Sequence, residues 1–216
     1  MPDPASRKPT KRAAQAAETK ARLIDVAIEV FSDTDYDQVA VADIAARAKV
    51  AHGLLFHYFG NKRGIYLAAV RATAEQLNAA FTFEPGATPR EMIHGALEQH
   101  LAYLHEHRGL ALRLVLGGRG VDSEAWEIYE AGRWHALEAF AGLLGLETTN
   151  QALRVVGRAA VSAIDEAVVQ WLDDTDVIDA QRLVAWMEAL IVACLGTAPV
   201  LDETFDLDRA IRALDG

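Results

Sequence analysis

Residues Lys49–Lys62 read KVAHGLLFHYFGNK. Two histidines, three aromatic residues and two leucines lie between a lysine at each end, with glycines at positions 53 and 60. A helix with a purely structural role buries its rings and shows charged side chains to solvent. Here polar rings alternate with apolar ones. The pattern predicts a short helix with one packed face and a second face that contacts a specific partner.

Two helical patterns precede this segment. Apolar residues recur at helical spacing at Leu23, Ala27, Ile28 and Phe31, and the turn SDTDYD (32–37) ends that helix. A shorter apolar set follows at Val41, Ile44, Ala45 and Ala48, and residues 49–51 separate it from the opening segment. Two short helices joined by such a turn and braced by a longer helix form a helix-turn-helix, whose second helix fits the DNA major groove.

The remainder of the chain also reads as helical, so we expect an all-α fold. Helices are predicted at about 63–81, 89–106, 110–116, 124–144, 150–172, 179–195 and 207–214. The start at Pro89 is the best defined, because Thr88 stands at the N-cap and Glu91 three residues later, which is the pattern of a capping box.

Charge is distributed unevenly along the chain. The net charge is −10, but residues 1–71 carry +3 and residues 72–216 carry −13. Every lysine lies at or before Lys62. This asymmetry predicts a polyanion-binding N-terminal part and an acidic remainder that repels DNA. We expect a flexible basic arm (1–13), a helix-turn-helix domain (14–71) and a helical ligand-binding and dimerisation domain (72–216).

The compartment follows from segments that the sequence lacks. We expect no membrane span, because no apolar run is judged to reach the roughly 18 residues that one needs, and the N-terminus has no apolar signal centre. The one cysteine, Cys194, excludes an internal disulfide, and its apolar neighbours indicate a core thiol. The sequence predicts a cytoplasmic protein with no membrane contact.

The run Val41–Val70, VADIAARAKVAHGLLFHYFGNKRGIYLAAV, resembles the DNA-binding signature of the TetR family of transcriptional regulators. The resemblance extends over about residues 15–70. It implies that His52, Gly53 and His57 approach base edges and that Tyr58 and Lys62 hold phosphates. At the start of a helix, an ammonium and free backbone N–H groups together suit a phosphate.

The segment departs from the family pattern at several positions. Lys49 and Ala51 stand where Gly and Ser are usual, Leu54 and Phe56 where Thr and Tyr are usual, and Val39–Ala40 where Thr or Ser is expected. Loss of the N-cap oxygen at Ala51 costs about 1 kcal/mol of helix stability. Candidates to replace the lost phosphate contacts are Lys49 and the arm residues Arg7, Lys8, Lys11 and Arg12.

A structural interpretation exists for the same residues. Core packing is the expectation for Leu54, Leu55, Phe56 and Phe59. Tyr58 has two interpretations, packing on the first helix or contacting phosphate. The arm likewise has two, since it either lies along DNA or remains solvated.

Residues 72–216 show no catalytic signature, so we predict neither an enzyme nor a cofactor. On the 89–106 helix His94, Glu98 and His105 share a stripe, but the two histidines are separated by about 16 Å, too far for one ion. A polar flank is the expectation there. The alternative to a regulator is a helical enzyme or ligand carrier with an incidental helix-turn-helix, which would use Asp165 and Glu166, or the histidines of the 89–106 helix, as acid and base.

A small-molecule site is expected in the acidic part, where a few polar groups accompany apolar ones. The candidate lining residues are Leu97, His100, Leu101, Leu104, Arg113, Trp126, Tyr129 and Trp134. The other interpretation is that these rings fill a solid core.

Dimerisation is predicted from the helices at about 150–172 and 179–195, which carry apolar residues over a wide arc. Trp186 belongs to the core row predicted for the second of these helices. Outside the two core rows lie Val155, Val161, Ala167, Leu172, Val184 and Ile191. The family resemblance implies a repressor that binds a palindromic operator as a homodimer and is released by a small-molecule ligand.

Overall fold

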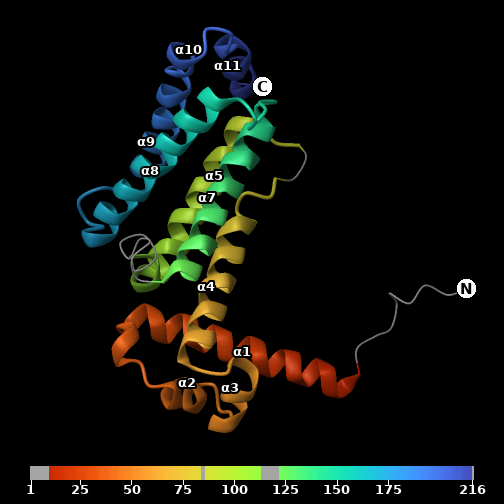
Figure 1. The fold of residues 1–216 in the computed structure, drawn as a ribbon. Coiled ribbons are helices and arrows are strands. Elements are labelled where there is room, and N and C mark those ends of the chain that lie inside the picture. The colour runs from red at the N-terminus through yellow and green to blue at the C-terminus, as the bar shows by residue number, and fades with distance from the viewer. Residues whose placement is uncertain (1–9, 84–85, 113–121, 216) are drawn as a thin grey trace, which may run out of the picture. The chain divides into compact units, whose positions relative to one another are not determined.

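The computed structural model describes residues 10–83, 86–112 and 122–215, and within them every regular element is a helix, which confirms the all-α prediction (Figure 1). The elements are α1 (Lys11–Asp33), the 3-10 turn η2 (Tyr36–Gln38), α2 (Val41–Arg47), α3 (His52–Phe59), α4 (Lys62–Ala79), α5 (Pro89–Glu106), α7 (Ser123–Leu143), α8 (Gln151–Asp173), α9 (Ala180–Leu195), α10 (Ala198–Leu201) and α11 (Leu207–Asp215). Most of the helix expected at 110–116 lies outside the described residues.

The chain divides into two compact units, residues 1–72 and 73–216. Helix α4 begins in the first unit and ends in the second. Each unit is described separately below.

In the first unit α1 begins earlier than expected. The hydroxyl of Thr10 accepts a hydrogen bond from the N–H of Ala13, and the helix starts at Lys11. Lys11 and Arg12 therefore belong to a helix and not to the arm, while Arg7 and Lys8 lie outside the described residues. The apolar stripe that α1 buries contains Leu23, Ala27, Ile28, Val30 and Phe31.

An aromatic cluster joins α1 to α4 in this unit. The Phe31 and Tyr66 rings meet edge to face at 5.2 Å, and Tyr36 meets Tyr66 at 5.0 Å. Such pairs add roughly 0.5–1.5 kcal/mol beyond the area that they bury. The 3-10 turn carrying Tyr36, which the sequence did not predict, is thus anchored to both long helices.

The junction between α3 and α4 depends on two glycines. Gly60 ends α3 with φ of 76°, a conformation that glycine adopts without strain. The side chain of Asn61 then caps α4 by accepting a hydrogen bond from Gly64 N–H at 2.8 Å. A Cβ at Gly64 would overlap the carbonyl oxygen of Phe59, so only glycine permits this approach of the two helices.

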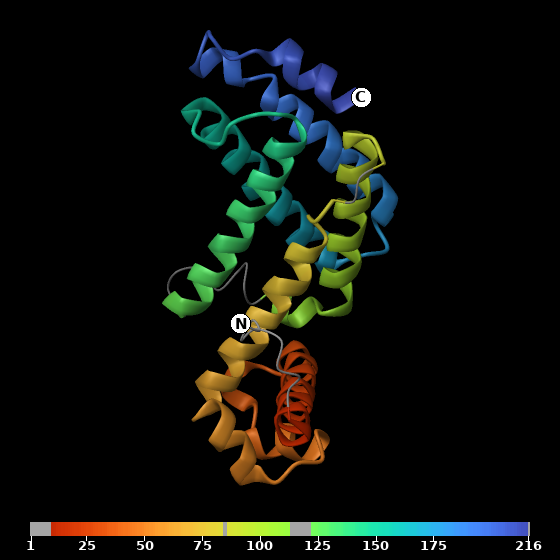
Figure 2. The ribbon, with the colours of Figure 1, turned by 90° about the vertical axis from the view of Figure 1, so that its right-hand side faces the viewer.

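In the second unit α9 packs against both α8 and α5, α7 packs against α8, and α11 packs against α5 (Figures 1 and 2). The capping box at Thr88 and Glu91 is confirmed, with both of its hydrogen bonds present. Asp122 caps α7 by accepting from the N–H groups of Glu124 and Ala125. Local sequence signals therefore set where these helices begin.

The stretch Ala180–Leu201 contradicts the expectation that no apolar run is long enough to span a membrane. By length and composition alone it would pass as a membrane-spanning helix, and 28% of the tested window is buried. A core helix of a soluble protein passes the same test, and α9 packs against α5 and α8 in the structure.

The wide apolar arcs of α8 and α9 are only partly exposed. Leu172 and Val184, expected outside the core, are buried within it. Trp186, expected in the core row, is instead 44% exposed, and Val155 is 52% exposed. Which side chains of α8 and α9 are buried depends on how these helices pack against each other and how α9 packs against α5. Helical spacing within one helix does not reveal this.

Gly64→Ala is expected to destabilise the N-terminal unit by about 1–3 kcal/mol, because the new methyl group forces the Phe59 carbonyl to move. The measurement is urea unfolding followed by circular dichroism. Gly53→Ala is the matched control, since no atom lies within 4 Å of a Cβ there. It should be neutral or stabilising by up to about 1 kcal/mol. Equal stability of the two variants would contradict the close approach at Gly64.

Candidate functional site

The turn between α2 and α3 has the geometry of a Schellman motif. The N–H of Val50 donates to the carbonyl of Ala45 at 3.0 Å, and the N–H of Lys49 donates to Ala46 at 3.1 Å. Lys49 has φ of 56°, the one positive φ among the described residues other than glycine. A side chain in this left-handed conformation costs roughly 1–2 kcal/mol. The turn therefore forms at the expense of local strain.

The two short helices receive little help from local capping. Neither Ala40 before α2 nor Ala51 before α3 provides a side-chain hydrogen bond, as their sequence predicts. A long-range contact reaches the turn instead, because Arg22 Nε of α1 donates to the carbonyl of Ala48 at 3.0 Å.

In α3 only Leu55 is fully buried. His52, Gly53 and His57 are exposed, as expected for a contacting face. Phe56, expected in the core, is 40% exposed, and its ring meets the His52 ring edge to face at 4.9 Å. Sequence reasoning missed Phe56 because an aromatic residue in a short helix is usually assigned to the core.

The end of α3 is half-buried. The Tyr58 ring lies between those of His57 at 5.4 Å and Phe59 at 6.2 Å. Lys20 Nζ of α1 stands 5.9 Å from the centre of the Phe59 ring. These ring contacts of Tyr58 are with its neighbours in α3 and not with the first helix, and because part of its surface is accessible, contact with phosphate stays a prediction.

Lys62 is turned toward the 3-10 turn. Its ammonium donates to the carbonyl of Asp37 at 3.1 Å and lies 4.8 Å from the Tyr36 ring centre. The side chain thus ties the start of α4 to η2. Lys49 is exposed, and its side chain has no hydrogen bond or ion pair with the described part of the chain.

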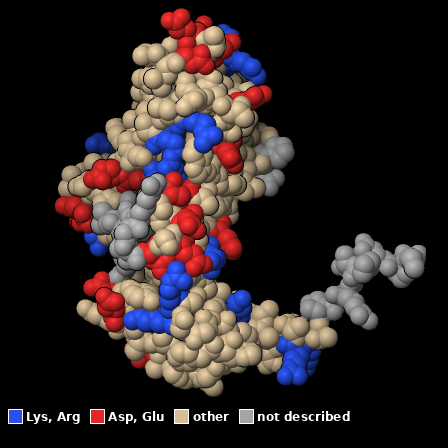
Figure 3. Space-filling view, viewed as in Figure 1, with Lys and Arg blue, Asp and Glu red and all other residues tan. Residues whose placement is uncertain are grey.

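On the face shown in Figure 3, the surface over α2 and α3 is largely uncharged, and both Lys/Arg and Asp/Glu atoms lie beside it. An uncharged centre suits a groove floor of base edges, and the cations beside it suit the phosphates that border the groove.

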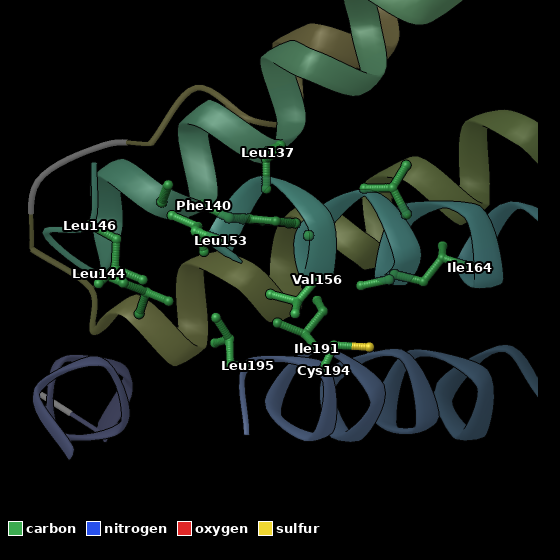
Figure 4. Close-up of a pocket in the computed structure, with 14 residues that line it drawn as sticks. Leu137, Phe140, Leu144, Leu146, Leu153, Val156, Ile164, Ile191, Cys194 and Leu195 are labelled. Carbon is green, nitrogen blue, oxygen red and sulfur yellow. The ribbon is translucent and has the colours of Figure 1, made fainter. Parts of the chain in front are cut away.

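The second unit contains an apolar cavity of about 50 Å³ between α7, α8 and α9. Side chains from the three helices converge on it (Figure 4). Its lining residues are Leu137, Phe140, Ala141, Leu144, Leu146, Leu153, Val156, Gly157, Ala160, Val161, Ile164, Ile191, Cys194 and Leu195. Cys194, predicted as a core thiol, is half-buried in this wall. The lining is hydrocarbon apart from its sulfur.

None of the ligand-binding residues expected from the sequence lines this cavity. Leu97, Leu101 and Leu104 are part of the solid core. Trp126 packs on Tyr129, whose pKa is raised by burial and by hydrogen bonding to Asp165. Arg113 lies outside the described residues. Gly157, against which Leu137 of α7 packs, and Ala160 are small residues among the larger apolar residues of the lining, and this is the signal in the sequence that could have located the cavity.

The rings of Phe81 and Phe140 connect His100 to this cavity. The His100 ring is 5.7 Å from that of Phe81, which in turn meets the cavity-lining Phe140 at 5.3 Å. Nδ1 is buried and has no hydrogen-bond partner among the described residues. Burial lowers the pKa of His100 to about 4, so the imidazole is neutral at pH 7.

The histidines of α5 that share a stripe have separate partners. His94 Nδ1 is 3.0 Å from Glu188 of α9, and Nε2 is 3.5 Å from Glu98. His105 packs against the Trp171 ring at 5.6 Å. In the described ranges no group of three or more His, Cys, Asp or Glu residues is arranged to hold a metal ion.

Comparison with known proteins gives two family matches. Residues 23–69 match the bacterial regulatory proteins of the tetR family, and residues 89–194 match the tetracyclin repressor-like C-terminal domain. The chain belongs to the TetR family. This confirms the resemblance seen in the sequence.

Among curated TetR-type relatives, the A-factor receptor protein of Streptomyces griseus is 29% identical over 99 residues, which are 45% of this chain and 34% of that protein. The transcriptional regulator BetI of Escherichia coli is 33% identical over 82 residues, 38% of this chain and 40% of BetI. The matched part therefore spans less than half the length of these relatives.

The fold is shared more widely than the sequence. A tetR-family regulator from Streptomyces coelicolor superposes with a TM-score of 0.83 at 22% identity, covering 92% of this chain and 89% of that one. A TetR-like regulator from Rhodococcus sp. RHA1 gives 0.62 at 24% identity, covering 86% and 96%.

The structure explains two residue types that are usual in the TetR family. Position 49 has a left-handed conformation, which favours glycine, and position 51 is an N-cap, which favours serine. This TetR-family chain has Lys and Ala there. Lys49 adds a cation at the turn, but its left-handed conformation and the missing cap at Ala51 lower the local stability.

Lys49→Gly is expected to raise the free energy of unfolding of the N-terminal unit by roughly 0.5–1 kcal/mol, because it relieves the left-handed strain. Lys49→Ala is the control, since it removes the same charge and keeps the Cβ. Thermal and urea unfolding of both variants separate strain from charge. A glycine variant no more stable than the alanine variant would contradict the strain.

The stability of the second unit is expected to fall as the pH falls from about 6.5 to about 4. Over this window the unfolded chain binds a proton at His100 that the folded chain, with its lowered pKa, does not. His100→Phe and His100→Gln both remove this titration, so each should show a shallower fall than wild type. Urea midpoints measured across pH 4–7 test this. Parallel curves for wild type and variants would refute it.

Proposed function

We propose that this TetR-family protein is a cytoplasmic transcriptional regulator that binds a palindromic DNA operator as a homodimer and is released by a small molecule. One observation carries the proposal. The short helix α3 buries Leu55 and leaves His52, Gly53, Phe56 and His57 exposed. This is the arrangement of a recognition helix, whose outer face enters a major groove.

Each exposed residue suits a contact in that groove. A histidine ring donates to or accepts from a base edge, and Phe56 offers an apolar surface of the kind that contacts a thymine methyl group. Gly53 has open space around it and permits close approach. Lys49 and Tyr58 flank this face and suit phosphates, and Lys62 has further N–H donors besides the one held by Asp37.

Dimerisation through α8 and α9 is supported by the apolar surface that they expose. Val155 and Trp186 are the largest exposed apolar side chains of these two helices. Isologous pairing of such a surface gives two recognition helices related by a two-fold axis. Operator half-sites about 34 Å apart, or a multiple of that distance, then match the two helices.

The effector would occupy the cavity between α7, α8 and α9. Its hydrocarbon walls favour an apolar group over a polar one. A ligand that favours another separation of the two recognition helices lowers operator affinity by population shift. Differential binding of roughly 1–3 kcal/mol is enough for a useful change.

A catalytic role is not proposed. Asp165, the carboxylate that an enzyme would use, is 3.0 Å from Arg133 and hydrogen-bonded by Tyr129. Glu166 beside it is exposed and accepts from Gln170.

Selection of bound fragments from random duplex DNA tests the function. We expect a palindromic motif and an affinity that falls steeply with salt, since each phosphate contact releases a counterion. A protein that is monomeric, or one that binds no duplex at low salt, would contradict the proposal.

Two variants distinguish contacts with bases from contacts with phosphates. His57→Ala should relax the selected motif at one position in each half-site, at about 1–3 kcal/mol per half-site. Lys49→Ala should weaken binding to all sequences alike and reduce the salt slope by about 1 per subunit. An unchanged motif for His57→Ala would remove that residue from base readout.

A further inference from the structure

A surface groove of about 590 Å³ lies where α8 begins, alongside α7. This is large enough for part of a small molecule. Its lining residues are Trp134, Thr149, Gln151, Arg154, Val155 and Arg158. The groove is built from both sides of the α7–α8 contact, and it makes no proposed contact with DNA, although Val155 also belongs to the exposed apolar surface proposed for dimerisation.

Two arginines are held in place on the same ring. The guanidinium carbon of Arg154 is 4.7 Å from the centre of the Trp134 ring, and that of Arg158 is 5.2 Å from it. Packing on an aromatic ring orders a guanidinium and leaves its N–H edge available for a planar anion. The two side chains are thus ordered before any ligand arrives.

The charges beneath the groove are nearly balanced. Arg158 Nη2 donates to Glu130 at 2.7 Å, and Arg133 donates to the other oxygen of Glu130 at 2.6 Å. Burial opposes ionisation of Glu130, but these hydrogen bonds outweigh it and lower its pKa. Arg133 also pairs with Asp165 at 3.0 Å. Two carboxylates therefore balance Arg133 and Arg158.

Arg154 takes no part in these ion pairs. No carboxylate in the described parts of the chain pairs with it, although residues 72–216 carry a net charge of −13. Arg154 lines the groove, and an anion there would pair with its guanidinium. Arg158 also lines the groove, while its Nη1 is buried away from the open space and has no hydrogen-bond partner among the described residues.

The groove and the apolar cavity lie on neighbouring faces of the same helix. Along α8, Gly157 lines the cavity, while Arg154 and Arg158 line the groove. Along α7, Trp134 of the groove stands one turn before Leu137 of the cavity. A Cβ at Gly157 would overlap Leu137, so this leucine side chain is packed at the boundary between the two spaces.

We propose that Arg154 and Arg158 bind the carboxylate or phosphate group of the effector, and that the effector's short apolar chain enters the cavity. The inference rests on the proposed release by a small molecule and specifies its chemistry. The cavity holds about four carbon-sized groups at about 10–15 Å³ each, so the expected chain is short.

Calorimetric titration of the full-length protein with hexanoate, hexyl phosphate, hexanol and acetate tests both parts of the ligand. At least one of the two six-carbon anions should bind about tenfold or more tightly than hexanol, as charged hydrogen bonds imply. The stronger of the two identifies the oxyanion. Acetate should bind at least about tenfold more weakly than hexanoate. Equal binding of hexanol and both anions would overturn the proposal, as would equal binding of acetate and hexanoate where hexanoate is the stronger of the two anions.

Arg154→Gln should reduce anion affinity about tenfold and leave hexanol binding unchanged. Arg154 is the better choice because removing Arg158 would also take away the donor to one oxygen of the Glu130 carboxylate. The matched control is Arg212→Gln, an exposed arginine of α11, which should bind every probe as wild type does. Unchanged anion affinity in Arg154→Gln would overturn the assignment.

Operator binding without a probe is measured on the same proteins and separates this inference from the proposed function. Wild type and Arg154→Gln should bind the selected operator equally. A protein that binds its operator but none of the probes refutes the anion groove and leaves the regulator intact. Failure to bind any duplex refutes the regulator, whatever the probes do.

Discussion

The burial of Leu55 is the constraint on which the DNA-facing surface depends. Helices of seven and eight residues, such as α2 and α3, do not persist alone in water because nucleation outweighs so few hydrogen bonds. Leu55 anchors α3 in the first unit. At about 100° per residue, Gly53 and His57 then lie about 200° from it and point outward. One apolar contact therefore sets both the existence of the helix and its rotation.

The α2–α3 turn is stabilised by partners distant in sequence. Its local features are unfavourable, with a left-handed lysine and two alanines where caps would stand. The contact of Arg22 with the end of α2 compensates for them, as does the close approach at Gly64. Such a site is expected to lose its geometry when α1 or α4 is loosened, even though neither helix supplies the recognition face.

The second unit has a large negative net charge, but its buried charged side chains form a balanced cluster. Glu130 and Asp165 lie between α7 and α8 with Arg133 and Arg158, and all four side chains are largely buried. Removing one member would leave another buried and unpaired, which is more costly than the pair is stabilising. Arg154 stands outside this balance. A net charge of −10 thus coexists with a local cationic groove, which a count over the whole chain conceals.

The sequence by itself determined the helical class, the helix start after the Thr88 cap, and the helix-turn-helix with its exposed histidines, because these depend on residues within a few positions of one another. Only the tertiary structure decided that Phe56 and Trp186 are exposed, that Leu172 and Val184 are buried, and that the cavity lies between α7, α8 and α9. Helical periodicity places residues on a face. Which face meets a neighbour, and where two faces fail to fill the space between them, depends on contacts between helices far apart in the chain.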